Sequence, residues 1–260
     1  MVDKNCWLGP GANKPFDSKL SEWRTNKLTK RSICVLRYIE QHSPIDINEY
    51  EENIIGYLNE YSVGGNKLNK KHTYAPFLFV GFIEKDQNTL KITEEGIGFL
   101  DHMCNQRFEE ATELYLDSLF MANFESEATD GVDVSVFPVQ IMFKMLYDKK
   151  IIPLFMFQTH IQYINDFSDL FNCLGLLDED CFFSYIKELQ DSFKEDSKKF
   201  KSTYKLATDK WRTYVIGGLV SLDIFDKDSY AQGYLKFTKN GMEYVEMKNI
   251  ANMNYESMFY

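Results

Sequence analysis

One string of residues occurs twice in this chain and limits the folds that the chain can adopt. The first copy is Thr89–Gly96 (TLKITEEG) and the second is Tyr234–Gly241 (YLKFTKNG). In each copy two apolar residues flank a lysine, a pattern that predicts a short strand with one buried face. The threonine that follows, Thr93 or Thr238, can accept a hydrogen bond from the free N–H groups of a helix start. Each copy therefore predicts a strand that leads directly into a helix.

A glycine lies three residues after the threonine in both copies, at Gly96 and Gly241. Because glycine has no side chain, the first turn of the new helix can pack closely against the preceding strand. The spacing predicts a close contact between strand and helix in both halves of the chain.

The residues upstream of the two copies also correspond. Each half has a threonine-tyrosine pair, Thr73-Tyr74 or Thr213-Tyr214, and then a run that ends in an acidic residue, lysine and aspartate, FIEKD or IFDKD. The order helix, hairpin, helix is that of a winged-helix unit, in which the hairpin is the wing. Short strings of this kind also arise by chance in α+β proteins, but their ordered repetition favours a duplicated unit. We therefore predict a mostly α fold with small β-hairpins (α+β), built from two winged-helix-like (winged helix-turn-helix) subdomains.

The 260 residues are enough for two modest domains. We predict a basic N-terminal arm over residues 1–31, a first winged-helix-like domain over 32–124, an acidic linker over 125–135 and a second winged-helix-like domain over 136–260. The arm contains several glycine and proline residues around Trp7 and is expected to be extended. The alternative for the arm is a solvated tail held in place by Trp7.

Several classes of protein are disfavoured by composition. No apolar run reaches the length of about 18 residues that a membrane span needs, and the N-terminus is too polar for a signal peptide. The five cysteines are widely spread and form no C-x-x-C pair, so neither a zinc site nor a disulfide framework is expected. The sequence predicts a cytoplasmic protein without a membrane partner and without a cofactor of its own.

The net charge of −10 is distributed unevenly along the chain. Residues 1–31 hold seven basic and three acidic side chains, and residues 194–212 hold seven basic and three acidic ones. Residues 94–133, in contrast, hold eleven acidic side chains and one arginine. An overall acidic protein can therefore carry a basic surface, and nucleic acid is not excluded as a partner.

Basic segments precede both predicted hairpins, where a winged helix presents its groove-facing residues. Lysines supply affinity for phosphates whatever the base sequence, while asparagine can pair with the edge of adenine, so Asn66 and Asn69 are the candidates for base reading. The alternative for the first segment is a solubilising basic turn, in which His72 is a bystander. The predicted DNA-binding residues are Lys14, Arg24, Asn66, Lys67, Asn69, Lys70, Lys71, His72, Lys198, Lys199, Lys201, Lys205, Lys210 and Arg212.

Three features resemble the N-terminal DNA-recognition region of the Alw-type type IIS restriction and nicking endonucleases. They are Trp7 followed by a glycine- and proline-rich arm with Lys14-Pro15, the run from Tyr74-Ala75-Pro76 through Gly81-Phe82 to Gly96, and Phe137-Pro138 at the start of an apolar helix. The resemblance spans roughly residues 5–245, and only the middle feature is specific.

The resemblance implies winged-helix subdomains that read a short asymmetric site in double-stranded DNA. In that family a separate C-terminal, magnesium-dependent nuclease domain cleaves the DNA. The only Glu-x-Lys string here, Glu246-Met247-Lys248, lies in a predicted helix, and no clustered carboxylates accompany it. We therefore expect recognition without a catalytic site in this chain. Mg²⁺ is expected only in a nuclease domain or subunit that would be a second partner.

Three other readings stay open. In the first, the acidic face of residues 94–133, with Glu109, Glu110 and Glu113, binds another protein and makes this a protein-interaction winged-helix module. In the second, the protein is a winged-helix transcription regulator. In the third, Glu246 and Lys248 belong to a hidden nuclease site. The recognised DNA sequence and the oligomeric state do not follow from these residues.

Overall fold

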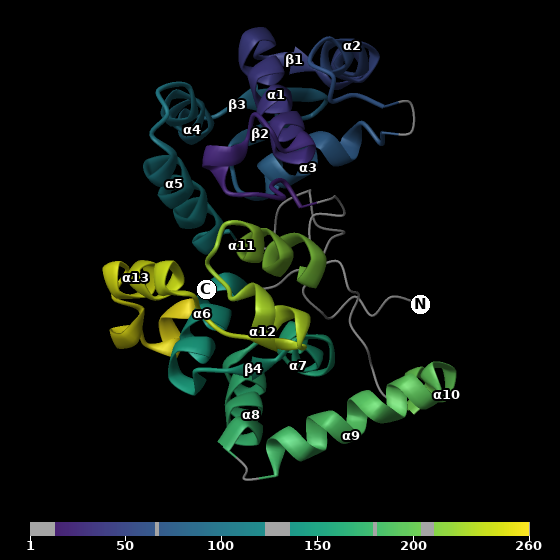
Figure 1. Ribbon diagram of the computed structural model, residues 1–260, viewed down its shortest axis with the longest axis vertical. Coiled ribbons are helices and arrows are strands. Elements are labelled where there is room, and N and C mark those ends of the chain that lie inside the picture. Colours follow the sequence, from purple (N-terminus) through teal and green to yellow (C-terminus); the bar gives the residue numbers. More distant parts are fainter. Residues whose placement is uncertain (1–13, 66–67, 123–135, 179–180, 204–210, 260) are drawn as a thin grey trace.

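The computed structural model describes residues 14–65, 68–122, 136–178, 181–203 and 211–259. It is mostly helical and contains one three-stranded and one two-stranded antiparallel sheet, which confirms the α+β class. Each sheet belongs to one of two units that are stacked along the long axis of the molecule (Figure 1).

In the first unit, helices surround the three-stranded sheet. Strands β2 and β3 form an antiparallel hairpin, and β1 pairs with the other edge of β3, so the order is β1-β3-β2. The elements are α1 (Lys27–His42), β1 (Ile45–Asp46), α2 (Ile47–Glu60), α3 (Lys71–Phe79), β2 (Ile83–Asp86), β3 (Thr89–Ile92), α4 (Glu94–Cys104) and α5 (Phe108–Phe120).

Helix α1 begins before Ser32, where the apolar pattern first indicates a helix. The side chain of Asn26 accepts hydrogen bonds from the N–H groups of Leu28 and Thr29, both at 3.0 Å, and so caps the helix at its true start. The last five residues of the predicted basic arm, 27–31, therefore belong to helix α1, and they include Lys27, Lys30 and Arg31.

The second unit repeats the order of the first unit with an insertion. Strand β4 pairs with β5 in an antiparallel manner, as β1 pairs with β3. In both units one helix precedes the first strand of the pair and another helix follows the second strand. The elements are α6 (Pro138–Lys149), β4 (Ile152–Pro153), α7 (Leu154–Thr159), α8 (Phe167–Asp178), α9 (Phe182–Glu195), α10 (Ser197–Thr203), a π-helical turn (Arg212–Ile216), α11 (Gly217–Ser221), α12 (Lys227–Ala231), β5 (Tyr234–Leu235) and α13 (Lys239–Met247).

Short 3₁₀ turns complete the chain, at Leu20–Glu22, Ile161–Tyr163, Ile250–Asn252 and Tyr255–Met258. None of the helices in the described residues is both long and apolar enough to cross a lipid bilayer.

The predicted contact between strand and helix is present in both units with the same geometry. Thr93 Oγ1 accepts from the Gly96 N–H at 3.2 Å, and Thr238 Oγ1 accepts from the Gly241 N–H at 3.0 Å. A Cβ atom placed on either glycine would lie 2.2 Å from a backbone oxygen, that of Phe82 in the first unit and that of Ile224 in the second. The glycines therefore allow the close approach that the sequence predicts.

The second hairpin differs from the first one. Asp226 accepts a hydrogen bond from the Ser229 N–H at 2.8 Å and starts α12, so residues that would extend the strand form a helical turn instead. The two arms of this hairpin are joined by one bridge, Phe225 to Phe237, and β5 has only two residues. The strand predicted over residues 234–237 is present only in part.

The insertion in the second unit consists largely of α8, α9 and α10. The sequence of residues 166–180 predicts an irregular segment, but Phe167–Asp178 forms helix α8. Leu170 and Cys173 on this helix are buried. Helices α9 and α10 extend away from the body of the molecule (Figure 1).

The two units share one continuous apolar core. The ring of Phe120 at the end of α5 lies 6.0 Å from that of Phe143 on α6 and 6.5 Å from that of Tyr244 on α13, measured between centroids. Asp117 on α5 accepts hydrogen bonds from Lys248 Nζ at 2.7 Å and from Tyr244 Oη at 3.0 Å. The units are thus held together by both apolar and polar contacts.

The described part of the N-terminal arm packs against the body rather than extending into solvent. Phe16 is fully buried, and its ring centroid lies 5.0 Å from that of Tyr115 and 5.9 Å from that of Phe99. Leu20 and Trp23 are buried as well. Residues 14–26, which we call the strap, therefore belong to the folded core, because a buried phenylalanine anchors them.

Candidate nucleic-acid interface

The first predicted basic segment leads into helix α3. The side chains of Asn69, Lys71 and His72 are exposed and that of Lys70 is half-buried. Asn69 Oδ1 accepts from the His72 N–H at 3.4 Å, and Thr73 Oγ1 donates to the Lys70 carbonyl at 2.5 Å. These bonds hold the start of α3, so its polar side chains are presented from a fixed backbone. Asn66 and Lys67 lie outside the described residues.

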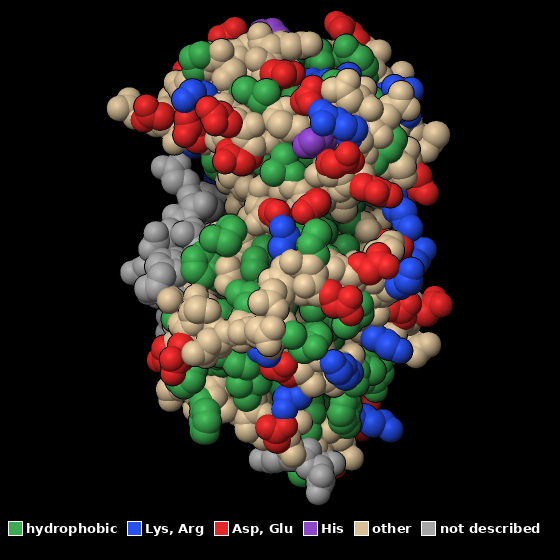
Figure 2. Space-filling view, turned by 90° about the vertical axis from the view of Figure 1, so that its left-hand side faces the viewer, with side chains coloured by type: hydrophobic (Ala, Val, Ile, Leu, Met, Phe, Trp, Pro, Cys, Tyr) green, Lys and Arg blue, Asp and Glu red, His purple; other side chains and the backbone are tan. Residues whose placement is uncertain are grey.

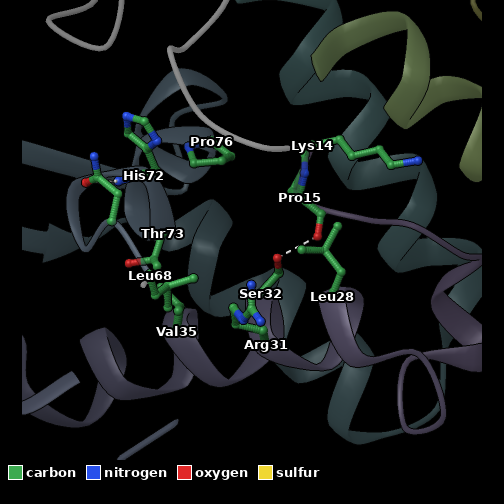
Figure 3. A pocket seen from close by; sticks show the side chains of 11 residues that line it. Lys14, Pro15, Leu28, Arg31, Ser32, Val35, Leu68, His72, Thr73 and Pro76 are labelled. Carbon is green, nitrogen blue, oxygen red and sulfur yellow. Dashed lines mark hydrogen bonds between the residues drawn. The ribbon is translucent and has the colours of Figure 1, made fainter. Parts of the chain in front are cut away.

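A pocket of about 200 Å³ lies beside this helix start (Figure 3). The strap, α1 and α3 each contribute a wall, and three of the lining residues carry nitrogen-based side chains that are cationic or can become so. The described lining is Lys14, Pro15, Leu28, Arg31, Ser32, Val35, Leu68, Asn69, His72, Thr73 and Pro76. Since this set contains no carboxylate, the pocket suits an anion better than a cation.

Arg31 is the one basic residue in the described lining of this pocket that is not among the predicted DNA-binding residues. Its Nε donates to the carbonyl oxygen of Val63 at 2.8 Å, and its burial lowers the pKa of the guanidinium from the ordinary value. The contact joins α1 to the segment after α2, 32 residues further along the chain. The sequence shows only that Arg31 ends a basic run, so only the fold could reveal its place beside Asn69 and His72.

Lys14 is one of the residues that line the pocket, but its side chain points away from the pocket. Its Nζ donates to Ser221 Oγ at 3.2 Å and forms an ion pair with Asp17 (Figure 3 shows the side chain leaving the pocket). The ammonium group is therefore engaged within the protein and links the strap to α11. This placement weakens Lys14 as a phosphate contact and makes it a structural residue.

Arg24 is exposed, and its guanidinium carbon lies 5.4 Å from the centre of the Trp23 ring. Arg37 lies 5.5 Å from the same ring. Trp23 therefore holds two arginines near the surface by cation–π contacts. The structure does not bring Arg24 into the pocket.

The second predicted basic segment is dispersed. Lys198 and Lys199 are exposed at the start of α10, where Asp196 Oδ1 accepts from their backbone N–H groups at 3.1 and 3.0 Å. Arg212 is half-buried in the π-helical turn that leads into α11. The side chain of Lys201 and the whole of Lys205 and Lys210 lie outside the described residues.

The two basic segments do not meet, but they share one side of the molecule in the view of Figure 1. The start of α3 and helix α10 both lie towards the right-hand side, one in each unit. Trp211, which precedes the π-helical turn, is fully buried, and its ring stacks on that of Phe157 with 6.0 Å between centroids, so it belongs to the core.

The described part of the acidic segment, residues 94–122, covers a different side. Helices α4 and α5 lie to the left in Figure 1, and Figure 2 views the molecule from there. Acidic side chains outnumber basic ones over the upper half of that face (Figure 2). A groove of about 780 Å³ runs between α5 and α13, and it is lined by four glutamates, Glu109, Glu110, Glu113 and Glu243, and by two basic residues, Lys19 and Arg107. The lining is acidic on balance. The charge is thus separated in space as well as in sequence.

Glu246 lies in the last turn of α13, and Lys248 follows the helix as its C-terminal cap residue. Lys248 is bound to Asp117 and lies 3.6 Å from Glu113, while Glu246 is exposed on α13. Over the described ranges, no three histidine, cysteine, aspartate or glutamate side chains come together as a metal site would require. Lys248 therefore serves the contact between the two units.

In comparisons with known proteins, no family model matches this chain and no curated protein sequence matches it significantly.

Proposed function

We propose that this chain binds double-stranded DNA in a sequence-specific manner, as the recognition domain or subunit of a type II restriction endonuclease. In this proposal each unit is a winged-helix domain. The observation that carries it is the order of elements in the first unit, in which helix, strand, helix, helix and hairpin follow one another with strand order β1-β3-β2. In such an arrangement the helix before the hairpin enters the groove.

The start of that helix supports the proposal. Asn69, Lys70, Lys71 and His72 lie at the beginning of α3, and no carboxylate is present among the described residues that line the neighbouring pocket. Lysines there would contact phosphates and Asn69 would read a base edge. In the second unit, three of the described residues would contact the phosphate backbone of DNA, namely Lys198, Lys199 and Arg212.

Cleavage in this proposal belongs to a partner. A magnesium-dependent nuclease domain or subunit would act on DNA that this chain positions. The Mg²⁺ ion would be held by that partner rather than by residues described here.

The experiment that tests the proposal is selection from a pool of duplexes with a randomised centre. The full chain should enrich a short asymmetric sequence over successive rounds, and a variant with Asn69→Ala should enrich it with relaxed preference at one position. Retention of duplexes without enrichment of any sequence would refute specific recognition. Failure to retain duplexes at all would refute DNA binding.

A protein-interaction module is the second candidate, and the groove between α5 and α13 favours it. Glu109 and Glu110 line this groove at the start of α5, together with the half-exposed Met247. A basic partner would fit such a surface. If charge reversal at Glu109, Glu110 and Glu113 abolished function while reversal at Lys70 and Lys71 left it intact, this candidate would replace the first one.

A winged-helix transcription regulator would bind DNA through the same α3 surface without any nuclease partner.

A further inference from the structure

We propose that the pocket between the strap, α1 and α3 is a phosphate-binding site in which Arg31 holds the anion. The shared chemistry is a phosphate group, which can come from the backbone of DNA or from a free phosphate compound. The DNA source rests on the function proposed above, while the pocket itself does not.

The state of the Arg31 side chain is the first reason. It is half-buried, and Nε is fixed by the Val63 carbonyl, which is itself buried in the turn after α2. Among the described residues no carboxylate pairs with this guanidinium, in contrast to Arg107, which is paired with Asp101. A guanidinium that is partly removed from water usually has an anionic partner, because burial of an unpaired charge is costly.

The composition of the wall is the second reason. The polar side chains around Arg31 are those of Ser32, Asn69, His72 and Thr73, and the rest of the described lining is apolar except for Lys14. The hydroxyl groups of Ser32 and Thr73 already donate to the carbonyls of Pro15 and Lys70, so the side chains of Asn69 and His72 are the ones offered as hydrogen-bond donors to an anion. Figure 3 shows Arg31 and Ser32 of α1 on one side of the pocket and Thr73 and His72 of α3 on the other, with the Ser32 hydroxyl directed at the Pro15 carbonyl. A volume of about 200 Å³ gives room for a phosphate group with some of its water.

The position of α3 is the third reason. The pocket opens beside the start of this nine-residue helix, where Asn69 and Lys70 precede the first turn. The positive end of the helix dipole there would add to the attraction that Arg31 exerts on an anion. The fixed Nε–H bond leaves the two terminal nitrogens of Arg31 to bind two phosphate oxygens.

The test uses the full chain and two ligands. Inorganic phosphate is titrated at constant ionic strength while the Arg31 Nε–H and the amides of residues 69–73 are followed by NMR. A short duplex is then titrated at several salt concentrations. The variants are Arg31→Gln and Asn69→Asp, and the control is Lys239→Gln, which removes one exposed charge on α13.

Phosphate should shift these signals saturably in the wild type and in the control. Arg31→Gln should weaken phosphate binding about tenfold or more, as expected for loss of a charge-assisted contact. Asn69→Asp keeps an acceptor for the His72 N–H, so the fold is preserved, but its carboxylate should repel phosphate and weaken binding comparably. This second variant keeps the test valid if Arg31→Gln fails to fold.

The two titrations distinguish DNA from a free phosphate compound as the source of the phosphate group. They also distinguish failure of the pocket proposal from failure of the DNA-binding proposal. If Arg31→Gln also lowers the salt slope of duplex binding by about 0.9, the phosphate belongs to DNA. If phosphate saturates the pocket but the duplex does not bind, or binds with an unchanged slope, the ligand is a free phosphate compound and the DNA source is wrong. If phosphate causes no saturable shift, the pocket proposal is overturned, whether or not the duplex binds.

Discussion

At the scale of single residues, two glycines decide how closely strand and helix can approach. The carbonyl oxygens of Phe82 and Ile224 occupy the space that a side chain at Gly96 or Gly241 would need. The sequence suggests this role through the distance of each glycine from its capping threonine. The structure adds which backbone atom lies opposite.

Replacing either glycine by alanine should therefore destabilise the protein. We expect Gly96→Ala and Gly241→Ala each to lower the free energy of unfolding by about 1–3 kcal/mol, because the methyl group would overlap a backbone oxygen that cannot rotate away. Urea unfolding measures this loss. Gly56→Ala is the control, since nothing lies within 4 Å of a Cβ there and the change in the interior of α2 should stabilise by about 0.5–1 kcal/mol. Equal effects at the three positions would contradict the proposed contact.

Other single residues could not be predicted from sequence. Lys14 was expected on a phosphate backbone, but its Nζ binds Ser221, 207 residues away. Arg31 was not expected in the site, and it lies there because Val63 anchors it. Both roles depend on contacts between distant parts of the chain, for which periodicity and charge counts carry no signal.

At the scale of elements, the strap is held by one aromatic side chain. Phe16 contacts Phe77, Phe99 and Tyr115, with ring centroids 6.4, 5.9 and 5.0 Å away. The glycine and proline residues nearby suggested an extended arm, because local composition does not show that a phenylalanine has a place in the core.

The Phe16→Ala variant should lose about 3–5 kcal/mol of stability, as expected when a buried aromatic ring leaves a cavity. Thermal or urea unfolding measures the loss. The matched control is Phe171→Ala, because the Phe171 side chain is 68% exposed and its removal should change stability by less than about 0.5 kcal/mol. A small effect at Phe16 would mean that the strap is not part of the core in solution.

The local sequence pattern does not predict two of the helices. Helix α8 was expected to be irregular, although it forms and buries Leu170 and Cys173. Helix α12 replaces the rest of a strand because Asp226 caps it. In contrast, the strand and helix around Thr93 and Gly96 were predicted well, since a cap and a close contact leave local signals.

Helix α3 should carry the affinity for DNA under the proposed function. Reversing Lys70 and Lys71 together to glutamate should weaken duplex binding by tenfold or more, since two phosphate attractions become repulsions. Reversing Glu109 and Glu110 to lysine on α5 should leave specific binding unchanged or slightly strengthen it through the net charge. Fluorescence anisotropy at fixed salt measures both. The opposite ranking would favour the protein-interaction module.

At the scale of the whole molecule, the two units are joined through Asp117, Tyr244 and Lys248. Burial raises the pKa of Tyr244, and the carboxylate of Asp117 raises it further. Because the hydrogen bonds cross from α5 to α13, the orientation of one unit relative to the other depends on them. The repeated strings predict two units, but they carry no information about how the units pack.

We expect Asp117→Ala to destabilise the protein by about 1–2 kcal/mol, because Lys248 and Tyr244 both lose an acceptor at a partly exposed contact. Urea unfolding followed by tryptophan fluorescence in a Trp7→Phe background measures the effect, with Trp23 reporting on the first unit and Trp211 on the second. Glu243→Gln, whose partner Lys239 is 89% exposed, serves as the control and should change stability little. No loss at Asp117 would mean that the apolar contacts alone join the units.

The most direct measurement of the central claim is the affinity of the full chain for a duplex as a function of salt. If this acidic protein binds DNA through basic residues at the starts of its helices, the logarithm of the binding constant should fall linearly with the logarithm of the salt concentration. The slope should be about −0.9 for each phosphate contacted. Affinity that stays constant as salt rises, or no measurable binding at low salt, would contradict the account.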